Sequence, residues 1–188
     1  LHEKGLHAIE QVNVDLGASE HLGAEFRAKS PLSKVPVLQL DDGRHLSESR
    51  AICSYLEGLH PQPNLMGDGF EERAFIEMAD RQVELYLFGA IANSIRHTHP
   101  GLAALEQPQF ADFGQAQARK LRESARWLDD TLAQQPWIAG ARFTIADITA
   151  FCAIEFARLI KFNAGAEGFA ALQAWRDRVA GRESASAW

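Results

Sequence analysis

The chain has 188 residues, of which 46% are hydrophobic, and a formal net charge of -6 at pH 7. This is enough apolar sequence to bury a sizeable core, in one domain or two small ones. The acidic balance argues against nucleic acid or an anionic membrane surface as a partner. No apolar run approaches the roughly 18 residues of a membrane span. We therefore expect a globular cytoplasmic protein that acts on small molecules or proteins.

The N-terminal third is predicted to mix short helices and strands. Glycine ends helices, alternating apolar residues favour a strand, and apolar residues three or four apart favour a helix. The run "DDGR" is a hairpin signal. The expected elements are the end of a helix at Gly5, a strand over 8–16, a helix capped by Ser19 and ending near Ser30, a strand over 35–40, a hairpin turn over 41–44 and a helix over 47–59.

The rest of the chain is predicted to be entirely helical. The run "HPQPNLMGDG" has two prolines and two glycines in ten residues, which stops a helix and marks a linker. We expect an α/β domain over 1–59, a linker over 60–70 and an all-α domain over 71–188. The helices are expected over 71–96, 113–135, 144–162 and 169–179, and Cys53 and Cys152 are expected to be reduced residues of the core.

Polar groups gather where the predicted hairpin meets the next helix, in "KVPVLQLDDGRHLSESRAICSYL". Pro36 stands at the head of a strand, and the triplet Ser47, Glu48 and Ser49 stands at a helix start. Unpaired N–H groups and the helix dipole favour an anion there. Two interpretations remain open: the triplet binds a ligand, or Ser47 caps the helix and Glu48 complements its dipole.

A second motif, "TIAD" from Thr144 to Asp147, is predicted to form a capping box at a helix start. We expect it to be structural, with a loss of roughly 1 kcal/mol or somewhat more when either residue becomes alanine.

The Val-Pro pair, the Glu-Ser pair and the Thr-x-x-Asp box, in this order and spacing, resemble the glutathione transferase superfamily of the bacterial cytosolic type. The resemblance covers nearly the whole chain. It implies a thioredoxin-like α/β N-terminal domain followed by an all-α helical bundle. Family members open with a strand, a loop and a helix that ends like Glu3-Lys4-Gly5, so we expect about 20 residues, with the first strand and most of the first helix, to be absent from this sequence.

The resemblance implies a glutathione site. Glu48 would pair with the α-ammonium group, and Ser49 would hold the γ-glutamyl carboxylate through its hydroxyl and N–H. Pro36 would be cis, which would turn the N–H and C=O of Val35 outward to pair with the cysteinyl backbone as an added strand does. Lys34 would meet the glycine carboxylate or remain a solvated lysine.

The same resemblance implies transfer of glutathione, as substrate, to a small hydrophobic electrophile. The catalytic residue is unknown, and we expect it in the absent N-terminal segment. Tyr86 and Asn93 would line the cleft for the electrophile, or else form an interhelical or dimer contact. The motif "HTH" at 97–99 would indicate metal only with a third ligand, so no metal is expected.

We also expect a two-fold homodimer, with part of the apolar surface of the helix over 71–96 facing a partner. The competing function is a non-catalytic binding or adaptor protein of the same fold. Such proteins often lose the Glu-Ser pair, so its presence favours an enzyme.

Overall fold

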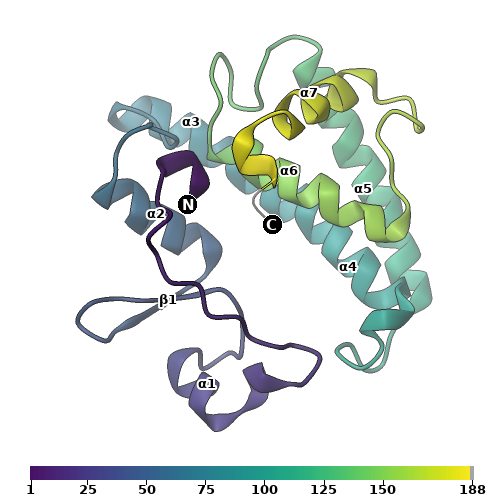
Figure 1. Cartoon of the computed structure of the whole chain (residues 1–188). Helices are drawn as coiled ribbons and strands as arrows, with labels where there is room; N and C mark the ends of the chain where they lie inside the picture. Colours follow the sequence, from purple (N-terminus) through teal and green to yellow (C-terminus); the bar gives the residue numbers. More distant parts are fainter. Residues whose placement is uncertain (187–188) are drawn as a thin grey trace. The chain divides into compact units, whose positions relative to one another are not determined.

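The computed structural model describes residues 1–186 and divides into two compact units, Leu1–Asn64 and Leu65–Trp188 (Figure 1). The division falls inside the segment 60–70, which the sequence predicts to be a linker. Each unit is described by itself.

A two-stranded antiparallel hairpin is the sheet of the N-terminal unit. Strand β1 (Val37–Gln39) pairs with β2 (His45–Ser47), and Leu38 lies opposite Leu46. The N–H of Leu40 donates to the carbonyl of Arg44 over 2.8 Å, which closes the turn. Gly43 has a φ of 81°, a conformation that glycine adopts without steric cost. The hairpin expected from "DDGR" is therefore confirmed.

Helix α2 (Ser49–Leu59) follows the hairpin, and its C-terminal end is bound by Lys4. The Nζ atom of Lys4 donates to the carbonyls of His60 at 2.7 Å and Pro63 at 2.9 Å, and lies 2.7 Å from Oε2 of Glu57. His60 is the C-cap residue of α2 and Pro63 follows it, and the C-terminal end of a helix carries partial negative charge, so a cation is favourable there. This contact fastens the short 3-10 helix His2–Lys4 to α2.

Replacing Lys4 with methionine, which keeps the apolar stem, is expected to lower the free energy of unfolding by about 1.5 to 3 kcal/mol, because charged hydrogen bonds are lost at a site where the lysine side chain is only 7% exposed. Urea unfolding measures this. Lys29→Met is the matched control, since Lys29 is 41% exposed and pairs only with Glu25 at the surface. Equal losses in the two variants would contradict the proposed role of Lys4.

Two expectations for the segment before the hairpin are wrong. Residues 8–16 form no strand, because a strand needs a ladder partner. In the described part of the chain this segment makes only turn contacts, from Asp15 and Leu16 to residues 18–20, and Val12 is 78% exposed. Ser19 does not cap a helix with its side chain. It precedes a 3-10 helix, Glu20–Leu22, and helix α1 (Ala24–Lys29) begins only after Gly23.

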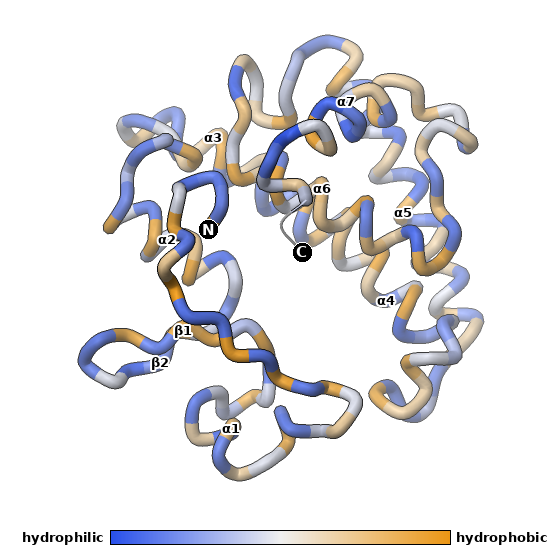
Figure 2. Tube along the Cα trace, in the orientation of Figure 1, coloured by the Kyte–Doolittle hydropathy of each residue, from blue (hydrophilic) through white to orange (hydrophobic). Residues whose placement is uncertain are grey.

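The C-terminal unit is a helical bundle, as expected, with boundaries shifted by a few residues. Its main helices are α3 (Gly69–Gln82), α4 (Gly89–Thr98), α5 (Ala111–Leu132), α6 (Ile145–Ala157) and α7 (Ala170–Ala180). In Figure 2 hydrophilic and hydrophobic residues alternate along these helices, the pattern of helices that bury one face. Short 3-10 helices are Pro100–Leu102, Arg158–Ile160 and Glu183–Ser186.

A π-helical turn, Val83–Phe88, joins α3 to α4 where one regular helix was expected. It buries Val83 and Leu87 completely and leaves Leu85 and Tyr86 more than 60% exposed. Turns of this kind inside helices are frequent at functional sites.

The capping box predicted at Thr144 is present and begins α6, the central helix of the bundle. Asp147 is fully buried and accepts four hydrogen bonds. Its Oδ2 accepts from the N–H (2.9 Å) and the hydroxyl (3.2 Å) of Thr144. Its Oδ1 accepts from the N–H of Ile138 (3.0 Å) and from Nε1 of Trp175 (2.9 Å). The motif therefore caps α6 and also links it to Ile138 in the preceding loop and to Trp175 on α7.

Candidate functional site

The junction of β2 and α2 has an unusual backbone. Glu48, the residue before the helix, has a φ of 70°, which is rare for a residue with a side chain. Such conformations persist where the surroundings impose them and gather at functional sites. Ser47 lies in β2 opposite Val37 and does not cap α2, so the interpretation in which it caps the helix is wrong.

The polar groups of this junction are available to a ligand. Glu48 and Ser49 are exposed, and within residues 1–186 neither the carboxylate nor the hydroxyl has a hydrogen-bond partner. The N–H of Ser49 belongs to the first turn of α2, where the helix itself supplies no acceptor. A carboxylate therefore stands beside an anion-binding helix start, which suits a ligand with an ammonium group next to a carboxylate.

The loop before β1 offers an open strand edge. The peptide bond between Val35 and Pro36 is cis. In the described part of the chain neither the N–H nor the C=O of Val35 has a hydrogen-bond partner, and Val35 is 43% exposed. A peptide that lies along this edge would gain one donor and one acceptor. The neighbouring Lys34 is exposed and adds a cation.

Ser30 holds this loop in place, a role that the sequence did not reveal. Its buried hydroxyl accepts from the N–H of Lys34 at 3.1 Å and donates to the carbonyl of the same residue at 3.0 Å. Both backbone groups of the residue before Val35 are thereby satisfied, while those of Val35 stay open. This role of Ser30 can be recognised only in the folded structure, because a serine that follows a helix is common and nothing else in the sequence marks it.

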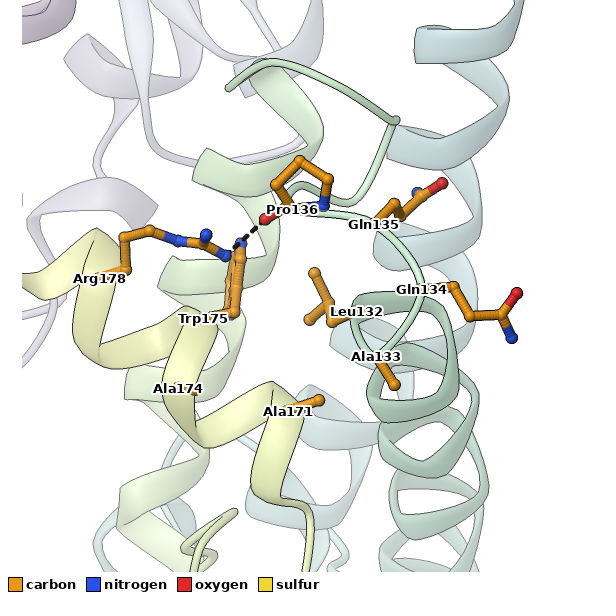
Figure 3. Close-up of a pocket in the computed structure, with 9 residues that line it drawn as sticks. All are labelled: Leu132, Ala133, Gln134, Gln135, Pro136, Ala171, Ala174, Trp175 and Arg178. Carbon is orange, nitrogen blue, oxygen red and sulfur yellow. Dashed lines mark hydrogen bonds between the residues drawn. The ribbon is translucent and has the colours of Figure 1, made fainter.

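A pocket of about 460 Å³ lies elsewhere, between the C-terminal end of α5 and α7 (Figure 3). The guanidinium of Arg178 turns toward the carbonyl of Pro136 and donates a hydrogen bond to it. The same group lies 4.4 Å from the ring of Trp137. None of the residues predicted to form the site lines this pocket.

Comparison with known proteins identifies the family of the chain. The family description "Glutathione S-transferase, N-terminal domain" matches residues 1–59, and "Glutathione S-transferase, C-terminal domain" matches residues 98–183. Glutathione S-transferase 2 of Saccharomyces cerevisiae is 34% identical over 95% of this chain and 77% of its own length. The chain belongs to the glutathione S-transferase family.

Solved structures place the fold in the same family. A glutathione S-transferase domain-containing protein of Marinobacter aquaeolei is 37% identical, with a TM-score of 0.90 over 97% of this chain and 90% of its own. The glutathione S-transferase fold, a thioredoxin-like domain followed by a helical domain, is thus confirmed. Elongation factor 1-gamma of Schizosaccharomyces pombe is also similar, 32% identical over 79% of this chain but only 34% of its own length.

Tyr86 and Asn93 lie in the C-terminal unit of this glutathione S-transferase family member. Tyr86 is 63% exposed in the π-helical turn, and its carbonyl accepts from the hydroxyl of Ser124 at 3.1 Å. Asn93 is half-buried on α4. Their place in a cleft for the electrophile stays a prediction.

Residues 1–186 contain no group of three or more histidine, cysteine or acidic side chains arranged to hold a metal ion. Across the same part of this family member, no helix has the length and apolar character to cross a membrane. Cys53 and Cys152 are half-buried, and neither forms a disulfide bond within residues 1–186.

Proposed function

We propose that this glutathione S-transferase binds glutathione at the junction of β2 and α2 and activates its thiol for attack on a small hydrophobic electrophile. The observation that carries the proposal is the pair Glu48 and Ser49 at the start of a helix, whose exposed side chains have no hydrogen-bond partner within residues 1–186. Rare backbone conformations gather at functional sites, so the positive φ of Glu48 beside an open helix start supports a ligand site there.

Glutathione has four polar features, and the N-terminal unit has a counterpart for each. The carboxylate of Glu48 pairs with the α-ammonium group, and the N–H and hydroxyl of Ser49 bind the α-carboxylate. Val35 exchanges hydrogen bonds with the cysteinyl backbone, an arrangement that Ser30 supports by fixing Lys34. The ammonium group of Lys34 meets the glycine carboxylate.

The chemistry follows from the thiol of the bound peptide. A thiolate is the nucleophile, so the enzyme must favour the charged form by hydrogen bonds or a nearby positive charge. The sulfur then attacks an electrophilic carbon, with Tyr86 and Asn93 proposed to contact the electrophile. No described residue is assigned to the sulfur itself.

Two measurements on one preparation test the proposal: retention on immobilised glutathione, and conjugation of glutathione to an activated aryl chloride. Retention together with conjugation supports the proposal. Retention without turnover of any electrophile favours the non-catalytic alternative. The similarity of this chain to elongation factor 1-gamma is the finding that motivates this alternative. Absence of both would reject the glutathione site.

A two-fold homodimer is proposed through an apolar face of α3. Phe75 is 59% exposed and Met78 is 49% exposed, one turn apart on that helix. Exposed apolar residues clustered in this way are typical of protein interfaces. A stable dimer would bury at least about 1,200 Å² in total.

Phe75→Glu is expected to give a monomer at low micromolar concentration, because a carboxylate in an apolar interface loses its hydration without a partner. Sedimentation velocity measures the mass. Leu159→Glu, at a residue that is 49% exposed on a different element, is the control and is expected to stay dimeric. A monomeric wild-type protein at high concentration would overturn the proposed assembly.

The cytoplasm stays the proposed location.

A further inference from the structure

We propose that the connector over 99–110, between α4 and α5, is a latch that is closed by two neutral histidines and opened by acid. The "HTH" motif supplies both histidines. His97 lies in the last turn of α4, and His99 begins the connector. The evidence is the way each imidazole ring bonds to the backbone.

His97 joins the two ends of the connector. Its Nδ1 accepts a hydrogen bond from the N–H of Phe110 over 3.1 Å, and Phe110 is the residue immediately before α5. Because Nδ1 accepts, the neutral ring must carry its proton on Nε2. The ring also contacts Phe113 edge to face, with centroids 5.0 Å apart.

His99 uses the same chemistry inside the connector. Its Nδ1 accepts from the N–H of Gly101 over 3.1 Å and thereby caps the 3-10 helix Pro100–Leu102. Gly101 packs closely against this ring, because a Cβ atom at this position would lie 3.0 Å from Cε1. Both histidines of the motif therefore depend on an unprotonated Nδ1.

The surroundings of His97 are tight and carry one charge. Glu106, on the connector, places Oε1 3.9 Å from Nε2 of the ring. From α5 the ring meets Phe113, and Gly114 packs against Cβ of His97 so closely that an added Cβ would lie 3.1 Å from it. Within residues 1–186 no ion pair involves His99.

The latch cannot stay closed when the imidazole rings of His97 and His99 are protonated. A protonated imidazole carries hydrogen on both nitrogens and has no acceptor. The N–H groups of Phe110 and Gly101 would each lose their partner, and the new Nδ1–H would face them directly. Gln109 still donates to the carbonyls of Arg96 (2.6 Å) and His99 (3.0 Å), so the connector loosens without detaching.

Histidine is the side chain whose charge ordinarily changes between about pH 5 and pH 8, so this is the range over which the latch is tested. The latch would thus couple the packing of α4 against α5 to pH. The inference does not use glutathione, so its test is independent of the proposed function.

Nuclear magnetic resonance on the full chain tests the latch. At about pH 7.5 the ¹⁵N shifts of both rings should show the unprotonated Nδ1 that the hydrogen bonds require, and the same shifts at about pH 5 report which rings have become charged. Over the same range the amide protons of Phe110 and Gly101 should lose about three- to tenfold of their protection from hydrogen exchange, each measured against its intrinsic rate. Full protection at the lower pH beside a charged His97 ring would overturn the proposal.

Variants separate a latch from a merely packed ring. In His97→Asn the amide oxygen stands near the position of Nδ1 and does not titrate, so protection of Phe110 should persist at the lower pH. His97→Phe keeps the ring and removes the acceptor, so protection should be low at both pH values. If His97→Asn loses protection in acid as the wild type does, the histidine is not the switch. His99→Asn provides the same test for Gly101.

Discussion

Replacing Ser49 with alanine is expected to weaken glutathione binding by about 1.5 to 3 kcal/mol, the range for a lost hydrogen bond to a charged group. The hydroxyl has no partner among residues 1–186, so its removal breaks no bond of the folded protein. Calorimetric titration measures the affinity. Ser54→Ala is the control, because Ser54 lies on the same helix and its hydroxyl accepts a hydrogen bond from the side chain of Arg50.

Glu48→Gly separates binding from folding at the same junction. Glycine adopts a φ of 70° without the cost that a side chain incurs, so the free energy of unfolding should not fall for reasons of backbone conformation. Binding should nevertheless weaken, because the carboxylate that pairs with the α-ammonium group is gone. Unchanged affinity in both Ser49→Ala and Glu48→Gly would remove these residues from the site.

The second large effect is expected at Asp147. Asp147→Ala should lower the free energy of unfolding by about 3 to 5 kcal/mol, because it leaves buried donors of Ile138, Thr144 and Trp175 without an acceptor. This exceeds the roughly 1 kcal/mol expected for a helix cap alone. Asp147→Asn should be milder, since its amide oxygen can still serve the donors of Ile138 and Trp175. Losses of only about 1 kcal/mol in the alanine variant would show that the motif does no more than cap α6.

The pH dependence of the free energy of unfolding, compared between the wild type and Asp147→Asn, gives a second test of Asp147. Burial, the largest cause, raises the pKa of Asp147 above its ordinary value of 3.8, although four hydrogen bonds partly offset it. The folded protein therefore keeps this proton to higher pH than the unfolded chain does. As the pH rises from 3.8 through the raised pKa, the free energy of unfolding of the wild type should fall relative to Asp147→Asn. A relative rise over that interval would contradict the direction of the shift.

Sequence reasoning succeeded where the determining chemistry is local. The turn at "DDGR", the helix that follows and the capping box at Thr144 each depend on residues within a few positions of one another. It failed for residues 8–16. Alternating apolar residues show which face of a strand would be buried, but they do not show whether a neighbouring strand is present to form hydrogen bonds with it.

The contacts that the sequence could not show are those between distant residues. Lys4 meets the end of α2 more than fifty positions away, and Trp175 reaches Asp147 across 28 positions. The π-helical turn before Gly89 also has no signature in the apolar spacing, which is compatible with a regular helix. At the candidate site the sequence suggested Glu48, Ser49 and Val35 through family resemblance. It did not suggest Ser30, whose role depends on how the loop closes.

The most direct test of the glutathione site is a titration of the ¹⁵N-labelled chain with glutathione, followed through the backbone amide resonances. If glutathione binds at the junction of β2 and α2, the amide chemical shifts of Val35 and Ser49 should change most. Smaller changes are expected at Lys34, and none at the pocket between α5 and α7. Saturable changes confined to that pocket, with Val35 and Ser49 unmoved, would contradict binding at this junction.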